Sequence, residues 1–182
     1  MDNLARVRRV SRVLTGLSVF FLVAIPIGLG ALWATFDLWV PRGLTVLGMK
    51  LPETPLPSPM PVVSLALGFA ISMIPGGLTM FALWNLRALF QLYARARLFT
   101  AENARRLRRF ALAVLLLGAL NPVCGAMISV ALTFTNPPGQ RVLSVTLDGS
   151  DMTTVFVGCV FLVIAWIMEE GRQLADEQAQ IV

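Results

Sequence analysis

The chain has 182 residues, of which 57% are hydrophobic and 14% are charged, and its mean hydropathy is +0.76. A soluble domain carries about 25% charged residues, so this composition excludes an ordinary soluble domain and indicates a membrane protein, whose apolar surface is solvated by lipid. The net charge of +5 does not indicate a direct nucleic-acid partner, because the basic residues flank apolar segments, where they set topology or contact anionic lipid.

Residues suited to catalysis or metal binding are scarce. There is no histidine, the single lysine is Lys50, and Cys124 and Cys159 lie in apolar segments, where we expect reduced packing residues. None of the four long apolar segments contains an acid or a base, although ion-coupled transporters and intramembrane hydrolases usually need such groups there. We therefore expect a non-enzymatic protein with no cofactor and no metal centre.

The first apolar segment follows a basic N-terminus and predicts a transmembrane helix over about residues 13–35. The 24 residues from Val13 to Phe36 carry no charge, and at about 1.5 Å per residue such a helix crosses about 30 Å of hydrocarbon. A signal peptide also begins with basic residues, but its apolar region is shorter, and this segment ends in a poor cleavage site. The segment is interpreted as a retained span.

The next segment, residues 36–61, predicts a loop that leaves the membrane. Its six prolines exclude a continuous helix and favour extended, polyproline-like chain from residue 52 to residue 61. Trp33 and Trp39 at its border are typical of the aromatic belt at a membrane surface. Within the loop, residues 44–50 predict a short strand.

The second apolar segment predicts a span over residues 62–84, which continues into a cytoplasmic helical hairpin over residues 85–109. The second helix of the hairpin should begin at Thr100, which is a good N-cap residue. Glu102 then lies in the first turn, where the helix dipole favours an anion and where the arginines three and four residues later are within reach.

The third and fourth spans are predicted over residues 110–135 and 152–168, and a cytoplasmic C-terminal helix over residues 169–178. Between the two spans, residues 140–150 alternate apolar and polar side chains, as a strand does. We expect this strand to pair with residues 44–50 in a small exterior sheet.

The distribution of basic residues predicts the orientation in the membrane. Twelve of the fifteen lie in the N-terminus, the hairpin and the tail, whereas three, Arg42, Lys50 and Arg141, lie in the two other connections. Cytoplasmic segments carry the excess of lysine and arginine, so both termini and the hairpin are predicted to be cytoplasmic.

Two short motifs resemble a known family. Before the third span the chain reads Phe99-Thr100-x-Glu102-Asn103-x-x-Arg106-Leu107-Arg108, and after the fourth it reads Glu170-Gly171-x-x-Leu174-x-x-Glu177. These motifs resemble the bacterial domain-of-unknown-function family 2975, and the resemblance extends over nearly the whole chain. One departure is Ala96-Arg97, where the family usually has a glycine. The resemblance implies a small four-span protein of a bacterial cytoplasmic (inner) membrane with no agreed activity. Some members accompany small helix-turn-helix regulators, which implies a membrane-bound regulatory partner.

The hairpin and the tail form a candidate interaction surface. Its arginines either only set topology and contact anionic headgroups, or they bind a cytoplasmic protein. We expect Glu169 or Glu170 on the tail to pair with one of the hairpin arginines and so to fix the register of the bundle. The residues of this candidate surface are Phe99, Thr100, Glu102, Asn103, Arg105, Arg106, Arg108, Arg109, Glu169 and Glu170.

A second candidate site lies in the middle of the spans. Pro75-Gly76-Gly77 should kink or open the second span, and Asn121-Pro122 lies near the centre of the third, so that freed carbonyls line a polar site, as in broken-helix transporters. In the simpler interpretation, Asn121 bonds a neighbouring helix and the prolines only bend their helices. The residues of this candidate midplane site are Pro75, Gly76, Asn121 and Pro122.

The predicted fold is an all-α membrane protein, a four-transmembrane-helix bundle with a small exterior cap of short β-strand and Pro-rich loop. The favoured function is a non-enzymatic membrane protein that holds or modulates a cytoplasmic regulator. The alternative is a small transporter or a lipid- or solute-binding protein that uses the kinked midplane. Expected partners are membrane lipid, anionic headgroups in particular, and a cytoplasmic regulator protein. A homo-oligomer stays open. Small residues such as Gly118 and Gly158 allow close helix approach, but such spacing is common in membrane helices.

Overall fold

The computed structural model describes residues 2–39, 56–95 and 100–180. It contains four long helices, α1 (Asp2–Ala34), α3 (Val62–Ala94), α4 (Ala101–Thr133) and α5 (Gly149–Gln180), and the short helix α2 (Phe36–Trp39). Each of the four long helices is long and apolar enough to cross a membrane. The prediction of an all-α, multi-pass membrane protein is confirmed.

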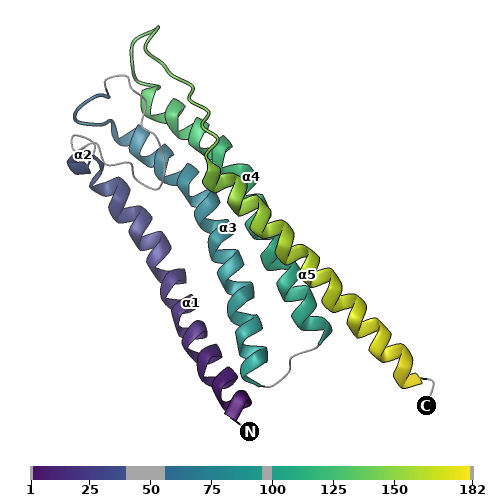
Figure 1. Cartoon of the computed structure of the whole chain (residues 1–182). Helices are drawn as coiled ribbons and strands as arrows, with labels where there is room; N and C mark the ends of the chain where they lie inside the picture. The colour runs from purple at the N-terminus through teal and green to yellow at the C-terminus, as the bar shows by residue number, and fades with distance from the viewer. Residues whose placement is uncertain (1, 40–55, 96–99, 181–182) are drawn as a thin grey trace.

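The long helices follow one another in space as they do in the chain (Figure 1). α1 packs against α3, α3 against α4, and α4 against α5, with neighbours running in opposite directions. Both termini, the end of α3 and the start of α4 therefore lie together at one end of the molecule (Figure 1). We call this end the basic end, and the end that holds α2 and residues 134–140 the distal end.

The helices bury little of their surface within the chain, which is the pattern expected of helices that face lipid. Large apolar side chains such as Phe20, Ile27 and Phe156 are 64%, 64% and 68% exposed. Small polar residues instead occupy the helix contacts, as for Ser64 and Ser72 of α3, which are 1% and 2% exposed. Small side chains at the contacts let helices approach closely, and in lipid this packing replaces the hydrophobic effect.

The distal half is held by an aromatic cluster between α1, α3 and α4. Trp33 stacks on Phe36 with ring centroids 5.1 Å apart, and its indole N–H donates a hydrogen bond to Ser72 Oγ at 3.2 Å. Gly68 of α3 makes this possible, because a Cβ at that position would collide with the Trp33 ring. Met60, just before α3, completes the cluster on the distal side.

Near the basic end, a second cluster joins α3, α4 and α5. Leu89, Leu107 and Ala165 are buried against one another. Phe110 of α4 meets Phe161 of α5 edge to face, with centroids 5.3 Å apart. These contacts set the depth of α5 against α4, so that the C-terminal part of α5 projects beyond the start of α4 (Figure 1).

The predicted exterior sheet is not supported by the residues that the structure describes. The described residues contain no strand, and residues 44–50, the expected partner strand, lie outside the described ranges. Residues 140–148 do follow an extended path with the predicted alternation, since Leu143, Val145 and Leu147 are exposed and the residues between them are half-buried. Their backbone bonds to α4 instead of a second strand: the Val142 N–H donates to Thr133 Oγ1 at 3.1 Å, and the Ser144 N–H donates to Ser129 Oγ at 2.9 Å.

Because residues 140–148 run back along α4, α5 begins well inside the molecule and not at its distal end (Figure 1). The distal half of the fourth crossing is therefore an extended chain, and only the half towards the basic end is a helix. α3 and α4, in contrast, continue through Pro75 and Pro122 as single helices, so neither proline opens its span as a broken helix would. α3 bends near its middle (Figure 1).

Candidate functional site

The start of α4 has the local structure that the sequence predicts. Thr100 is the N-cap, and its side chain accepts a hydrogen bond from the Asn103 N–H at 3.3 Å. Glu102 forms an ion pair with Arg106, with Nη2 and Oε1 3.4 Å apart. Asn103 is 0% exposed, so it supports the helix start and does not belong to a surface. Phe99 lies outside the described residues.

The remaining arginines of this turn are presented to solvent or headgroups. Arg105, Arg108 and Arg109 are exposed, and they lie within one turn of each other on α4. None of the three forms an ion pair with a side chain that the structure describes. We refer to Arg105, Arg108 and Arg109 as the basic surface.

The predicted ion pair between the tail and the hairpin is absent from the described side chains. Glu169 instead bonds Arg172 on its own helix, with Oε1 and Nη2 2.9 Å apart, and Glu170 is exposed. A partner three residues away on the same helix needs less ordering than a partner on another helix, which explains the preference. The hydrogen bond from Arg172, with a smaller Coulombic contribution from Arg105, holds the pKa of Glu169 below its usual value.

The four residues of the candidate midplane site do not meet in one place. Gly76 is buried against α1, where a Cβ would lie 2.9 Å from Leu29 Cδ1. Asn121 faces α5 on the other side of α4 and donates a hydrogen bond from Nδ2 to Asp151 Oδ1 at 2.8 Å. The two halves of the predicted site therefore contact different helices, as the simpler interpretation of Asn121 predicts.

Asp151 is the residue that the sequence reasoning missed. It is 7% exposed, and besides the bond from Asn121 it accepts a hydrogen bond from the Asp148 N–H at Oδ2, at 3.2 Å. The Asp151 N–H in turn donates to the Asp148 carbonyl at 3.0 Å, so Asp151 closes the first turn of α5, and its carboxylate caps the N–H of Asp148, the residue just before the helix. Asn121 lies twelve residues beyond Arg109, or about 18 Å along the helix, which places Asp151 near the middle of a hydrocarbon layer of about 30 Å.

Two features of the sequence point to this arrangement in retrospect. The fourth uncharged segment has only 17 residues, which is the shortest of the four. The spacing Asp148-x-x-Asp151 before it is that of a capping box. A short span preceded by a capping carboxylate is what a helix that starts inside the membrane requires.

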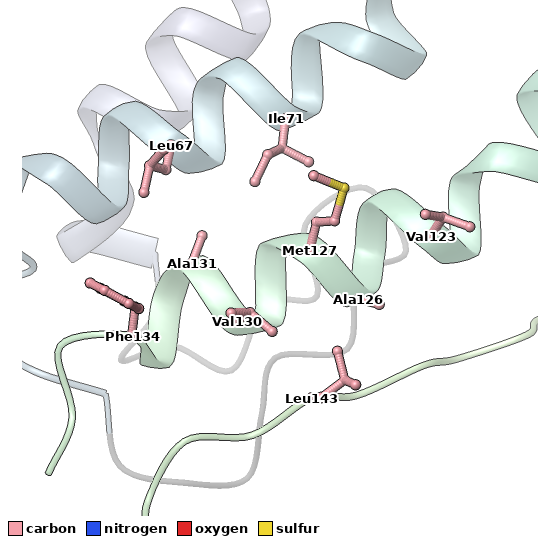
Figure 2. Close-up of a pocket in the computed structure, with 9 residues that line it drawn as sticks. All are labelled: Leu67, Ile71, Val123, Ala126, Met127, Val130, Ala131, Phe134 and Leu143. Atoms are coloured by element: carbon pink, nitrogen blue, oxygen red, sulfur yellow. The ribbon is translucent and has the colours of Figure 1, made fainter. Parts of the chain in front are cut away.

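An apolar groove lies between α3 and α4 in the distal half (Figure 2). It has a volume of about 410 Å³ and is open along one side. α3 contributes Leu67 and Ile71, the extended segment contributes Leu143, and α4 contributes six residues between Val123 and Phe134. Figure 2 shows Ile71 of α3 facing Met127 of α4, and Leu143 on the extended chain beside α4.

Comparisons with known proteins agree with the two sequence motifs. The model of a family of proteins of unknown function, DUF2975, matches residues 6–182. The comparison with curated proteins found no match, and neither did the comparison with solved structures. The family match covers nearly the whole chain and all four apolar helices, so the protein belongs to the DUF2975 family.

Proposed function

We propose that this protein is a non-enzymatic membrane protein of a bacterial inner membrane that holds an acidic segment of a cytoplasmic protein on its basic surface. The observation that carries the proposal is that Arg105, Arg108 and Arg109 are exposed and that none of them forms an ion pair with a carboxylate that the structure describes. Guanidinium groups bind carboxylates through paired hydrogen bonds, so an exposed cluster of three favours an acidic protein segment.

The shape of the basic end supports the same function. α5 continues beyond the start of α4, the helix that carries the basic surface, so the polar C-terminal part of α5 forms a projecting arm at this end of the molecule (Figure 1). A peptide or a helix placed on the arginines would meet this arm as a second wall. Anionic headgroups are the competing occupant, because arginines next to an apolar helix also attract lipid.

Photocrosslinking in living cells separates these two occupants. A photoreactive amino acid replaces Glu102, which is exposed one turn before the basic surface. We expect a covalent adduct with one cytoplasmic protein that disappears in the Arg105→Glu, Arg109→Glu double variant. The adduct should persist in the matched Arg105→Lys, Arg109→Lys variant, which keeps the charge. Adducts with lipid alone, or a protein adduct unaffected by charge reversal, would contradict the proposal.

A further inference from the structure

We propose that the groove between α3 and α4 holds one acyl chain of a phospholipid whose phosphate group is bound by Arg141. This site lies in the distal half of the molecule, away from the basic surface, and it is independent of the function proposed above. The occupant follows from the length of the groove, its chemistry and the charge at its mouth.

The length of the groove matches one leaflet of a bilayer. Its lining on α4 runs from Val123 to Phe134, eleven residues apart, or about 16 Å along the helix. The hydrocarbon core of a bilayer is about 30 Å thick, so one leaflet provides about half of this depth. The groove ends one residue from Pro122 at mid-depth and at Phe134 near the distal surface, as an acyl chain from the distal leaflet requires.

The groove exists because the chain beside α4 is thin at this depth. A packed helix is about 10–12 Å across, whereas an extended chain takes up only about 5 Å beside its neighbour. Over the distal half of α4 the neighbour is the extended segment, held by Ser129 and Thr133, and α5 begins only at Gly149. The space that a full-length helix would fill is left as a trough with apolar walls.

A cation is placed at the mouth of this trough. The guanidinium carbon of Arg141 lies 5.4 Å from the centroid of Phe134, the residue that lines the distal end of the groove. Arg141 Nε donates to the Asn136 carbonyl at 3.4 Å, which fixes the side chain over the ring. The terminal nitrogens of an arginine held in this way can bind two phosphate oxygens at once. A phosphate above Phe134 with an acyl chain below it is the arrangement of a membrane phospholipid.

The test uses a photoactivatable phospholipid with a diazirine in the middle of one acyl chain, mixed into vesicles that contain the full-length protein. We expect peptides that contain residues 123–134 to be labelled more strongly than the lipid-facing side of α1. Val130→Trp places a large ring in the groove and should abolish the excess labelling. Leu116→Trp is the matched control, because Leu116 is similarly exposed on α4 but does not line the groove, and its labelling should stay unchanged.

The role of the phosphate is tested separately and without altering the groove. Arg141→Gln should lower the excess labelling about tenfold, the effect of losing one charge-assisted contact, whereas Arg141→Lys should keep most of it. A diacylglycerol that carries the same diazirine but no phosphate should label poorly. Labelling spread evenly over all four helices, labelling unchanged by Val130→Trp, or equal labelling by the two lipids would overturn the proposal.

Discussion

At the scale of single residues, the buried Asp151 carboxylate depends on hydrogen bonds from its neighbours. A carboxylate near the middle of a membrane is costly, and here the cost is offset by hydrogen bonds from the Asn121 amide and from the Asp148 N–H just before α5. Asn121→Leu removes the amide donor and leaves the carboxylate underbonded. We expect this variant to lose about 1–2 kcal/mol of unfolding free energy, measured by denaturation in detergent.

The matched control for this prediction is Thr153→Val. Thr153 is also exposed on a membrane helix, but its hydroxyl only bonds the Gly149 carbonyl of its own helix, at 2.8 Å, so its removal should have little effect. In an Asp151→Asn background, Asn121→Leu should cost less, because a neutral amide is easier to leave without a partner than a carboxylate. Equal losses in both backgrounds would show that the bond to the Asp151 carboxylate is not what Asn121 contributes.

At the scale of elements, the contact between α4 and α5 depends on two glycines. A Cβ at Gly158 would lie 2.8 Å from the Leu115 backbone nitrogen, and a Cβ at Gly118 would lie 2.7 Å from Val155 Cγ2. Gly158→Ala must push the two backbones apart, since a backbone atom cannot move aside as a side chain can. We expect a loss of about 1–3 kcal/mol in the same denaturation measurement.

Gly125→Ala is the control for helix propensity. A Cβ at Gly125 would meet nothing within 4 Å, so this variant should gain up to about 1 kcal/mol from the better helix former. We therefore predict that Gly158→Ala lowers the unfolding free energy and that Gly125→Ala raises it. If the two variants were equally stable, α4 and α5 could not approach as closely at Gly158 as described above.

The elements that the sequence predicts correctly are those whose causes are local. Uncharged segments give the four long helices, and Thr100 followed by Glu102 gives the start of α4 with its ion pair to Arg106. The alternation over residues 140–148 is also real. The alternation of side chains does not identify the hydrogen-bonding partner of the segment. Here the hydroxyl groups of Ser129 and Thr133 accept backbone N–H bonds that a second strand would otherwise accept.

Contacts between residues of two different helices were harder to predict from the sequence. Glu169 has an arginine three residues away on its own helix, so the expected bond to α4 had a local competitor. Asn121 and Asp151 are thirty residues apart in sequence, and they meet only because the extended segment carries the chain back to mid-depth before α5 begins. Two residues of the candidate midplane site likewise have different neighbours, since Gly76 lies against α1 and Asn121 bonds to α5.

At the scale of the whole molecule, neighbouring helices run in opposite directions, so the orientation of one helix in the membrane determines the orientation of the other three. The N-terminus, the end of α3, the start of α4 and the C-terminus share the basic end (Figure 1). Cation–π contacts mark both boundaries of the apolar layer, with Arg87 5.3 Å from the Trp84 ring at the basic end and Arg141 over Phe134 at the distal end. Once one position is assigned to a side, every other position follows.

We predict that the basic end is cytoplasmic, because twelve of the fifteen basic residues lie in segments at that end. In a background of Cys124→Ala and Cys159→Ala, a single cysteine is introduced as Gln140→Cys or Arg95→Cys, both at exposed positions at opposite ends. A membrane-impermeant maleimide added to intact cells should label the first variant, and should label the second only after the membrane is permeabilised. The reverse pattern would invert all four helices at once and place the basic surface outside the cell. Labelling of both variants in intact cells would mean two orientations. The reverse pattern would rule out a cytoplasmic partner for the basic surface, whereas two orientations would limit such a partner to the molecules whose basic end is cytoplasmic.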